Sequence, residues 1–379
     1  MATEKETKQA DEIAQNYEDV NILYITLLAE QVGNIQLGDF DVIAQRDITN
    51  QNLKKIRTET AKAQKKSIKQ ATMLIDKEAR KTDAQMSKYY KAKGVKQIPF
   101  KKNRQILNTL EAIKRTTAGS FKNISGTTAR SIRYQRCIDK AILSVQSGSS
   151  NYQQAINKAV RQTVKSANKI EYASGYRRRV DTAVRMNILD GVRQVQMEVQ
   201  RIAGEQFGAD GVEIDAHGLC AEDHIGVQGR IFACEDYGVD NTDDLVEAIN
   251  TEEIDSDRGI GQWNCQHEAH PIVVGVSKPS YSDEDLEEMR QFTEEPIPEL
   301  NGMNRRDASQ KMRQIETKVR EDKEELLQAK TRYKITGQEA DKKEVQRYER
   351  KIAKNQGNYD ALCSKAGLKP QKWRMQIHA

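Results

Sequence analysis

The chain has 379 residues, of which 31% are charged, 37% are hydrophobic and only 6% are aromatic. This length predicts two or three domains, and so few aromatic residues exclude one large globule with a deep aromatic core. Five cysteines, an odd and sparse number, exclude a disulfide scaffold. The polar first residues do not resemble a secretory signal, and the longest apolar run is about half of a bilayer span. We therefore expect a chain made in a reducing cytoplasm, with no membrane helix.

Charge is segregated along the chain. The net formal charge is −7 over residues 1–50, +24 over 51–202, −21 over 203–300 and +9 over 301–379, although the whole chain carries only +5. Each block presents its own field to its surroundings. The basic blocks suit a polyanion or an acidic protein surface, whereas the acidic block would repel nucleic acid.

The first 149 residues predict an elongated, basic, all-helical region. Apolar residues at three- and four-residue spacing predict a helix over residues 11–32. Residues 40–95 are lysine-rich and helix-forming, with apolar positions too sparse for a thick core. A short helix is expected around residues 107–113, and the Ser-Gly-Ser-Ser at 147–150 marks a domain boundary.

Residues 150–280 predict a small mixed α+β domain. An amphipathic helix over 152–168 precedes the best-patterned segment, a helix over 175–207 with one continuous apolar stripe. The stripe consists of Val180, Val184, Ile188, Val192, Val195, Val199 and Ile202. Alternating residues over 212–217 then predict a strand, with further strands at 230–233 and 271–276 and a short helix at 242–250.

Residues 281–379 predict a linker followed by a charged helical hairpin. Apolar residues within 312–327 and 345–362 give the two helices a thin seam, and Thr336-Gly337 is the turn between them. The expected fold class is therefore α+β and predominantly α-helical. It comprises a helical region at 1–149, a mixed domain at 150–280 and a hairpin region at 281–379.

Histidines and cysteines gather in two short segments of the mixed domain, about forty residues apart. The cluster comprises His217, Cys220, His224, Cys265, His267 and His270. Sulfur and imidazole ligands in two such groups are typical of a structural zinc site, although the spacing is not that of a standard finger. Alternatively, these side chains hydrogen-bond the turns of a domain with little core. A catalytic metal would need an open position and a base such as Glu222, Asp223 or Glu268.

Five arginines lie off the apolar stripe of the 175–207 helix or just before it. They are Arg177, Arg178, Arg179, Arg185 and Arg193. They are candidates for contact with DNA phosphates or a partner protein, or they form a solvated helix face. The chain contains no P-loop, no dinucleotide-binding glycine motif and no nucleophile elbow. Nothing in the sequence marks an activated nucleophile.

Short motifs follow one another in order from Tyr152 to Trp373. They are Tyr152-Gln-Gln-Ala-Ile-Asn-Lys-Ala-Val, Tyr172-Ala-Ser-Gly-Tyr-Arg, Asp181-Thr-Ala-Val-Arg185, Val212-Glu-Ile-Asp-Ala-His217, Gln228-Gly-Arg, Asn264-Cys-Gln-His267, Asp307-Ala-Ser-Gln310 and Lys365-Ala-Gly-Leu-Lys-Pro-Gln-Lys-Trp373. This series resembles the second type of phage minor capsid protein, from tailed phages of Gram-positive bacteria. That family is similar in turn to the Mu F-like head morphogenesis proteins. The resemblance covers roughly residues 150–379.

His217, His224, Cys265 and His267 match the motif of that family. Cys220 does not, because many members have Ala-Arg and then Pro at Leu219-Cys220-Ala221. The resemblance implies a low-copy virion protein inside the head, near the portal, that assists procapsid assembly and DNA packaging or delivery. Its implied partners are the portal protein, the major capsid or scaffold protein, and packaged double-stranded DNA.

The resemblance carries over no catalytic residue, so we expect no enzyme and no certain cofactor, with zinc as the candidate ion. Two alternatives remain open at this point. One is a metal-dependent nuclease that uses the histidine and cysteine cluster, and the other is a free DNA-binding protein.

Overall fold

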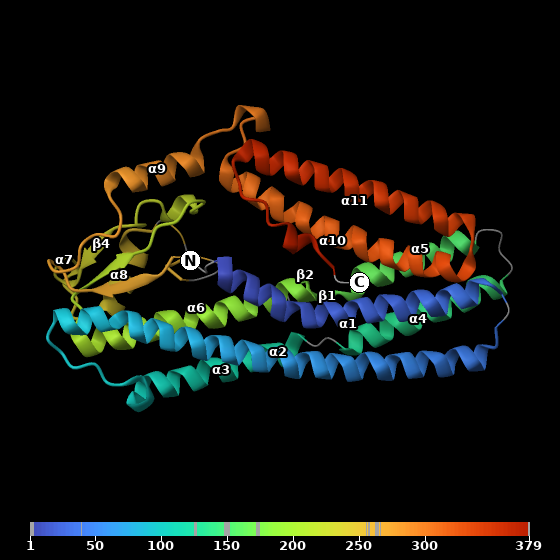
Figure 1. Ribbon diagram of the computed structural model, residues 1–379, viewed down its shortest axis with the longest axis horizontal. Coiled ribbons are helices and arrows are strands. Elements are labelled where there is room, and N and C mark those ends of the chain that lie inside the picture. The colour runs from blue at the N-terminus through green and yellow to red at the C-terminus, as the bar shows by residue number, and fades with distance from the viewer. Residues whose placement is uncertain are drawn as a thin grey trace.

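The computed structural model describes residues 4–38, 40–124, 127–147, 152–171, 175–254, 256, 258–261, 265 and 267–377. Within these residues the chain forms eleven α-helices and five short strands, all of them in antiparallel pairs (Figure 1). The expected class, α+β and predominantly helical, is confirmed. No helix among the described residues is long and apolar enough to cross a membrane.

Six helices form an elongated body. They are α1 (Glu4–Gln36), α2 (Val42–Ala92), α3 (Arg104–Ile124), α4 (Thr127–Gln146), α5 (Tyr152–Ala167) and α6 (Val180–Phe207). One apolar core joins α1, α2, α3 and α6, and a second joins α1, α2, α4 and α5. The short helix η1 (Phe100–Lys102) links α2 to α3. Helices α1 and α2 each contribute to both cores, so they hold the two halves of the body together.

The apolar stripe of α6 is fully buried, because α1, α2 and α3 cover it. Helix α6 therefore belongs to the helical body, and so does α5, although both lie beyond the predicted division at residue 149. The predicted boundary segment itself falls mostly on residues 148–150, outside the described part of the chain. Helix α6 begins at Val180 rather than near 175, since Arg177–Arg179 form strand β2, which pairs with β1 (Lys169–Glu171).

A three-stranded sheet lies at one end of the body (Figure 1). Its central strand is β3 (Gly211–Ile214), flanked by β4 (Ile231–Ala233) and β5 (Ala269–Ile272), both antiparallel to it. Helices α7 (Cys234–Tyr237) and α8 (Thr242–Glu252) complete this small domain, which has its own apolar core. The third strand ends before residue 276, because the chain turns at Gly275, where φ is 76°.

Close backbone packing fixes glycine at the start of the central strand. A Cβ atom on Gly211 would lie 2.6 Å from the carbonyl oxygen of Phe232 in β4. No side chain fits at that distance without a shift of the neighbouring strand.

The C-terminal part forms a helical hairpin that lies along α1. Helix α9 (Asp283–Glu294) and the short helix η3 (Pro298–Leu300) lead into α10 (Arg305–Thr336) and α11 (Glu339–Ala366), and the short helix η4 (Lys372–Met375) follows. Gly337, with φ 62°, ends α10 in the left-handed conformation, at the turn that the sequence predicts. The hairpin has a separate apolar core, and α10 contacts both α1 and α5.

A buried ionic cluster joins the hairpin to the helical body. Arg179, directly before α6, lies 2.7 Å from Glu324 of α10, 3.0 Å from Asp181 and 3.5 Å from Glu18 of α1. Arg320 of α10 also pairs with Asp181. All five side chains are at most 7% exposed. Charges removed from water to this degree must be paired, so the cluster fixes how the three elements meet.

Candidate metal centre

Three potential metal ligands meet beside the small sheet. His224 ends the short helix η2 (Glu222–His224), and Cys265 and His267 precede β5. One ligand atom from each side chain lies within 4.8 Å of the other two. All three residues are at most 4% exposed. The β3–β4 loop and the segment before β5 are distant in sequence, and the antiparallel pairing of β3 with β5 brings them together.

His267 lies at the centre of the group. Its Nδ1 is 3.5 Å from the sulfur of Cys265, and its backbone N–H donates to the same sulfur over 3.4 Å. Its Nε2 is 3.3 Å from the side-chain oxygen of Gln228, which also accepts the backbone N–H of His217. Because that oxygen only accepts, it favours a proton on Nε2 of His267.

His224 is oriented by a carboxylate. Its Nδ1 lies 2.9 Å from Asp223, which is held in turn by Arg258 and by the hydroxyl of Ser256. Its Nε2 is buried and makes no hydrogen bond to any described residue. Burial opposes charge on the ring, but contacts with Cys265 and Asp223 outweigh it and raise the pKa of His224.

The surroundings of Cys265 favour ionisation of its thiol. Burial alone would raise the pKa of the thiol, but contacts with His224, His267 and nearby backbone N–H groups outweigh it and lower the pKa to about 5. At neutral pH this cysteine is therefore a thiolate, the form that binds metals. The carbonyl oxygen of Cys265 accepts a hydrogen bond from Arg193 of α6 at 2.6 Å, which attaches this segment to the helical body.

Of the other residues in the predicted cluster, His217 and Cys220 lie beside His267, whereas His270 lies apart. The His217 ring stacks on His267 with centroids 4.4 Å apart, and its Nδ1 lies 3.1 Å from the carbonyl oxygen of Gly218. Burial lowers the pKa of His217 to about 4, and its Nε2 has no hydrogen-bond partner in the described chain. Cys220 lies 3.5 Å from Nε2 of His267, and burial raises its pKa to about 12. His270 is separate, because its Nδ1 lies 2.5 Å from Gln200 of α6.

The five candidate arginines differ in exposure. Arg179 belongs to the buried ionic cluster, Arg185 is buried against Asp11 of α1, and Arg193 binds the carbonyl of Cys265. Arg177 is exposed and pairs with Glu171 at 3.2 Å. Arg178 stacks over the ring of Tyr176 at 5.4 Å. Three of the five therefore hold the fold together, and contact with DNA or a partner stays a prediction for Arg177 and Arg178.

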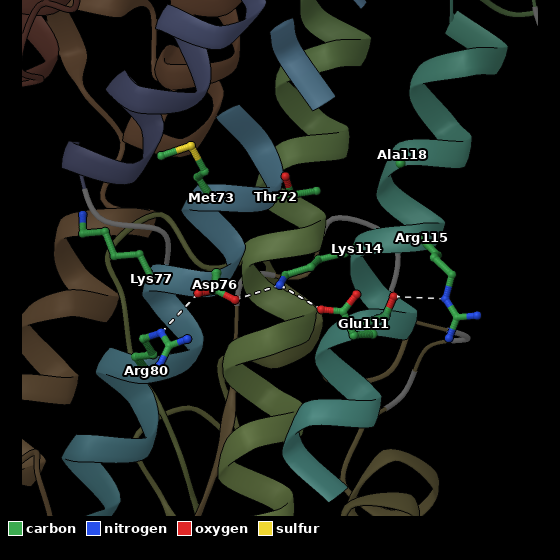
Figure 2. Close-up of a pocket in the computed structure, with 9 residues that line it drawn as sticks. All are labelled: Thr72, Met73, Asp76, Lys77, Arg80, Glu111, Lys114, Arg115 and Ala118. Atoms are coloured by element: carbon green, nitrogen blue, oxygen red, sulfur yellow. Dashed lines mark hydrogen bonds and ion pairs between the residues drawn. The ribbon is translucent and has the colours of Figure 1, made fainter. Parts of the chain in front are cut away.

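A surface groove between α2 and α3 also carries several charges (Figure 2). Asp76 accepts from Arg80 at 3.1 Å and from Lys114 at 2.7 Å, and Lys114 also binds Glu111 at 3.1 Å. Arg115 donates to the backbone carbonyl of Glu111. Because these cations already bind oxygen acceptors of the chain, the groove is not a prepared phosphate site.

Comparison with known protein families identifies the family of the chain. The family model described as "Phage minor capsid protein 2" matches residues 41–362, from α2 to the last turns of α11. The chain belongs to this family. It is a phage minor capsid protein and hence a component of the virion. No curated protein matches this minor capsid protein, and no solved structure does.

Sequence reasoning missed the groups that orient the cluster of this minor capsid protein. Gln228 appears in the sequence only as part of a family-like motif, and Arg258 and the carbonyl of Gly218 carry no signal there. Arg193 is a sequence-based candidate for contact with DNA or a partner, or for a solvated helix face. Asp223 was considered only as a base. Its position directly before His224 is a usable signal, since a carboxylate beside a histidine often fixes which ring nitrogen is protonated.

Proposed function

We propose that this minor capsid protein is a non-enzymatic head component that binds the portal inside the capsid. In this role it assists procapsid assembly and the packaging or delivery of double-stranded DNA. Membership of the family supports a structural role in the virion. The observation that carries the rest is a lysine stripe on α2.

The lysine stripe occupies one side of α2. It consists of Lys54, Lys55, Lys62, Lys65, Lys66 and Lys69, all of them exposed. At about 100° per residue these six positions fall within roughly a third of the helix circumference. Within the described residues only Lys62 has a carboxylate at ion-pair distance, Glu59 at 2.8 Å. The stripe is therefore available to an acidic partner.

The stripe and the acidic small domain lie apart on the same elongated molecule. Residues 54–66 belong to the half of α2 that lies farther from the small sheet, and Lys69 follows just past the middle of the helix (Figure 1). The C-terminal end of α2 lies beside that sheet, where Tyr90 packs on Phe207 and Val273. A molecule with opposite charge at two places binds a polyanion or an acidic portal surface in one orientation. This supports a fixed orientation within the head, with the acidic domain away from DNA.

Burial of the histidine and cysteine cluster supports a non-enzymatic role. A hydrolytic metal needs a coordination position that substrate or water can reach. His224, Cys265 and His267 are at most 4% exposed. No other observation favours the nuclease alternative.

A portal pull-down with the full chain tests the proposal. The test variant replaces four stripe residues by glutamate: Lys55, Lys62, Lys66 and Lys69. The matched control replaces four exposed lysines of the hairpin by glutamate: Lys334, Lys342, Lys343 and Lys354. We expect wild type and control to be retained by the portal, and the stripe variant to bind at least about tenfold less, since opposed charges steer and orient such contacts. Failure of the wild-type chain to bind the portal overturns the portal assignment.

Two further measurements address DNA and assembly. If the stripe meets DNA, duplex binding weakens steeply with added salt, because each neutralised phosphate releases counterions, and the stripe variant shows a shallower salt slope than the control. Phage lacking the protein should still form capsid shells but give fewer infectious particles. Cleavage of plasmid by the purified protein with a divalent metal, abolished by His267→Ala, would establish the nuclease instead.

A further inference from the structure

We propose that His217, His224, Cys265 and His267 bind one zinc ion that stabilises the small domain. This site goes beyond the head function and does not depend on it. It rests on the geometry of the cluster, on the groups that orient its rings and on two buried ring nitrogens.

Distances within the cluster match tetrahedral zinc. Bonds of about 2.3 Å to sulfur and 2.0–2.1 Å to nitrogen separate two tetrahedral ligands by about 3.6 Å. Cys265 Sγ and His267 Nδ1 are 3.5 Å apart. Two imidazoles on one tetrahedral zinc have centroids about 5.2 Å apart. The rings of His224 and His267 have centroids 5.3 Å apart and planes within 20° of each other.

Each histidine has one ring nitrogen bound to an oxygen, as metal-bound histidines do. Nδ1 of His224 faces Asp223, Nε2 of His267 faces Gln228, and Nδ1 of His217 faces the carbonyl of Gly218. In His224 and His267 this arrangement leaves the second ring nitrogen for the metal.

Two of those second nitrogens are buried without a hydrogen bond in the described chain, Nε2 of His217 and Nε2 of His224. Buried polar atoms nearly always have a partner. A cation coordinated by both rings supplies one for each. His217 stacks face-on against His267, so its ring must turn about the Cβ–Cγ bond before its in-plane lone pair meets the same ion.

Cys220 is a neighbour rather than a ligand. It lies beside Nε2 of His267, the nitrogen that Gln228 engages, whereas Cys265 faces Nδ1. Its thiol donates to the carbonyl of Ala221 at 3.2 Å. Cys220 therefore provides a matched control, a buried cysteine in contact with the same ring.

The ligand set selects the metal and its role. One thiolate and three imidazoles suit zinc, whereas calcium and magnesium prefer oxygen ligands. Four protein ligands close the coordination shell, which is typical of a structural site.

The ion would connect three parts of the fold. His217 and His224 come from the β3–β4 loop, and Cys265 comes from the segment before β5, which Arg193 anchors to α6. In the loop, Leu219 has a positive φ of 70°, and its N–H donates to Thr293 of α9 at 3.0 Å. Zinc would therefore hold the loop against which α9 packs.

Metal content and cobalt spectroscopy of the full chain test the proposal. The protein is produced with zinc in the medium and purified without chelator. We expect about one zinc per chain, and after exchange a tetrahedral cobalt(II) spectrum with a thiolate-to-cobalt charge-transfer band. A wild-type chain that holds no zinc and gives only an octahedral cobalt spectrum overturns the proposal.

Two cysteine variants then test the ligand assignment. Cys265→Ser should lose the zinc and the charge-transfer band, whereas Cys220→Ser should keep both. The reverse pattern overturns the assignment. His217→Ala should lose more than about tenfold in zinc affinity in competition with a chelator, since losing a ligand costs more than losing a residue that only orients one. Circular dichroism of the helical body checks folding, and if Cys265→Ser does not fold, the wild-type cobalt spectrum decides.

Discussion

Glu18 of α1 should make the stability of this protein fall as pH rises. Its carboxyl is buried beside Glu324 and Asp181, with Arg179 at 3.5 Å. Burial first, and the charge of Glu324 second, raise the pKa of Glu18 from 4.5 to about 8. The carboxyl is therefore protonated at neutral pH. Arg179 and Arg320 then balance Asp181 and Glu324, and the buried cluster is neutral.

The magnitude follows from the shift in pKa. Each pKa unit is worth about 1.4 kcal/mol, so full ionisation of Glu18 in the folded protein costs about 5 kcal/mol. Below pH 4.5 the carboxyl is protonated in both folded and unfolded states, and its contribution to stability is fully present. As pH rises from about 4.5 through about 8, the unfolded chain ionises more readily, and this contribution is lost.

Glu18→Gln should remove this pH dependence, because glutamine resembles the protonated acid. Urea unfolding followed by circular dichroism from pH 5 to pH 9 measures it. The stability difference between variant and wild type should be about 1 kcal/mol at pH 5 and reach several kcal/mol at pH 9, in favour of the variant. The difference isolates Glu18 from other raised acids such as Glu325, whose pKa burial raises to about 7. Glu12→Gln, an exposed change on the same helix, is the control. If both variants track wild type at every pH, the reasoning about the buried cluster is wrong.

Two further changes test the packing, both by chemical denaturation. Asp341→Ala should destabilise the hairpin by about 3–5 kcal/mol, because it leaves Arg332 buried without its ion pair at 3.2 Å. An effect below about 1 kcal/mol would mean that water reaches this guanidinium. Gly211→Ala should cost about 2 kcal/mol or more, since its Cβ would meet the carbonyl of Phe232 at 2.6 Å. Gly357→Ala, in α11 with nothing within 4 Å, should instead stabilise by about 0.5–1 kcal/mol, and a loss there would contradict the helix argument.

Local periodicity carried most of the fold prediction. The stripe from Val180 to Ile202 predicts helix α6 and its buried side, because every third or fourth residue is apolar. It cannot show which helices cover that side. The sequence predicts that the helix begins near residue 175, but Arg177–Arg179 instead form a strand that pairs with residues 169–171. Tertiary pairing of that kind leaves no local signal.

The arginines show that sequence periodicity also does not reveal the tertiary partners of single side chains. Arg179 lies off the apolar stripe, which by pattern alone means solvent or a phosphate. Its partners Glu18 and Glu324 come from α1 and α10, the latter 145 positions away. By contrast, the histidines and cysteines could be singled out because few residue types bind soft metals and four of the five histidines lie in two short segments. What orients them, such as Gln228, is a common residue that only coordinates distinguish.

The place of α1 among its neighbours governs when this chain can fold on the ribosome. Helix α1 is synthesised well before α10, yet it packs against α10 as well as α2 and α6. Asn21 donates to Glu324 across a separation of 303 positions. One side of the nascent α1 therefore stays uncovered until α10 has emerged from the ribosome. Long-range contacts of this kind form late and leave the growing chain exposed to aggregation. We expect translation products interrupted before α10 to be degraded or held by chaperones, so that only molecules that contain the hairpin enter the virion.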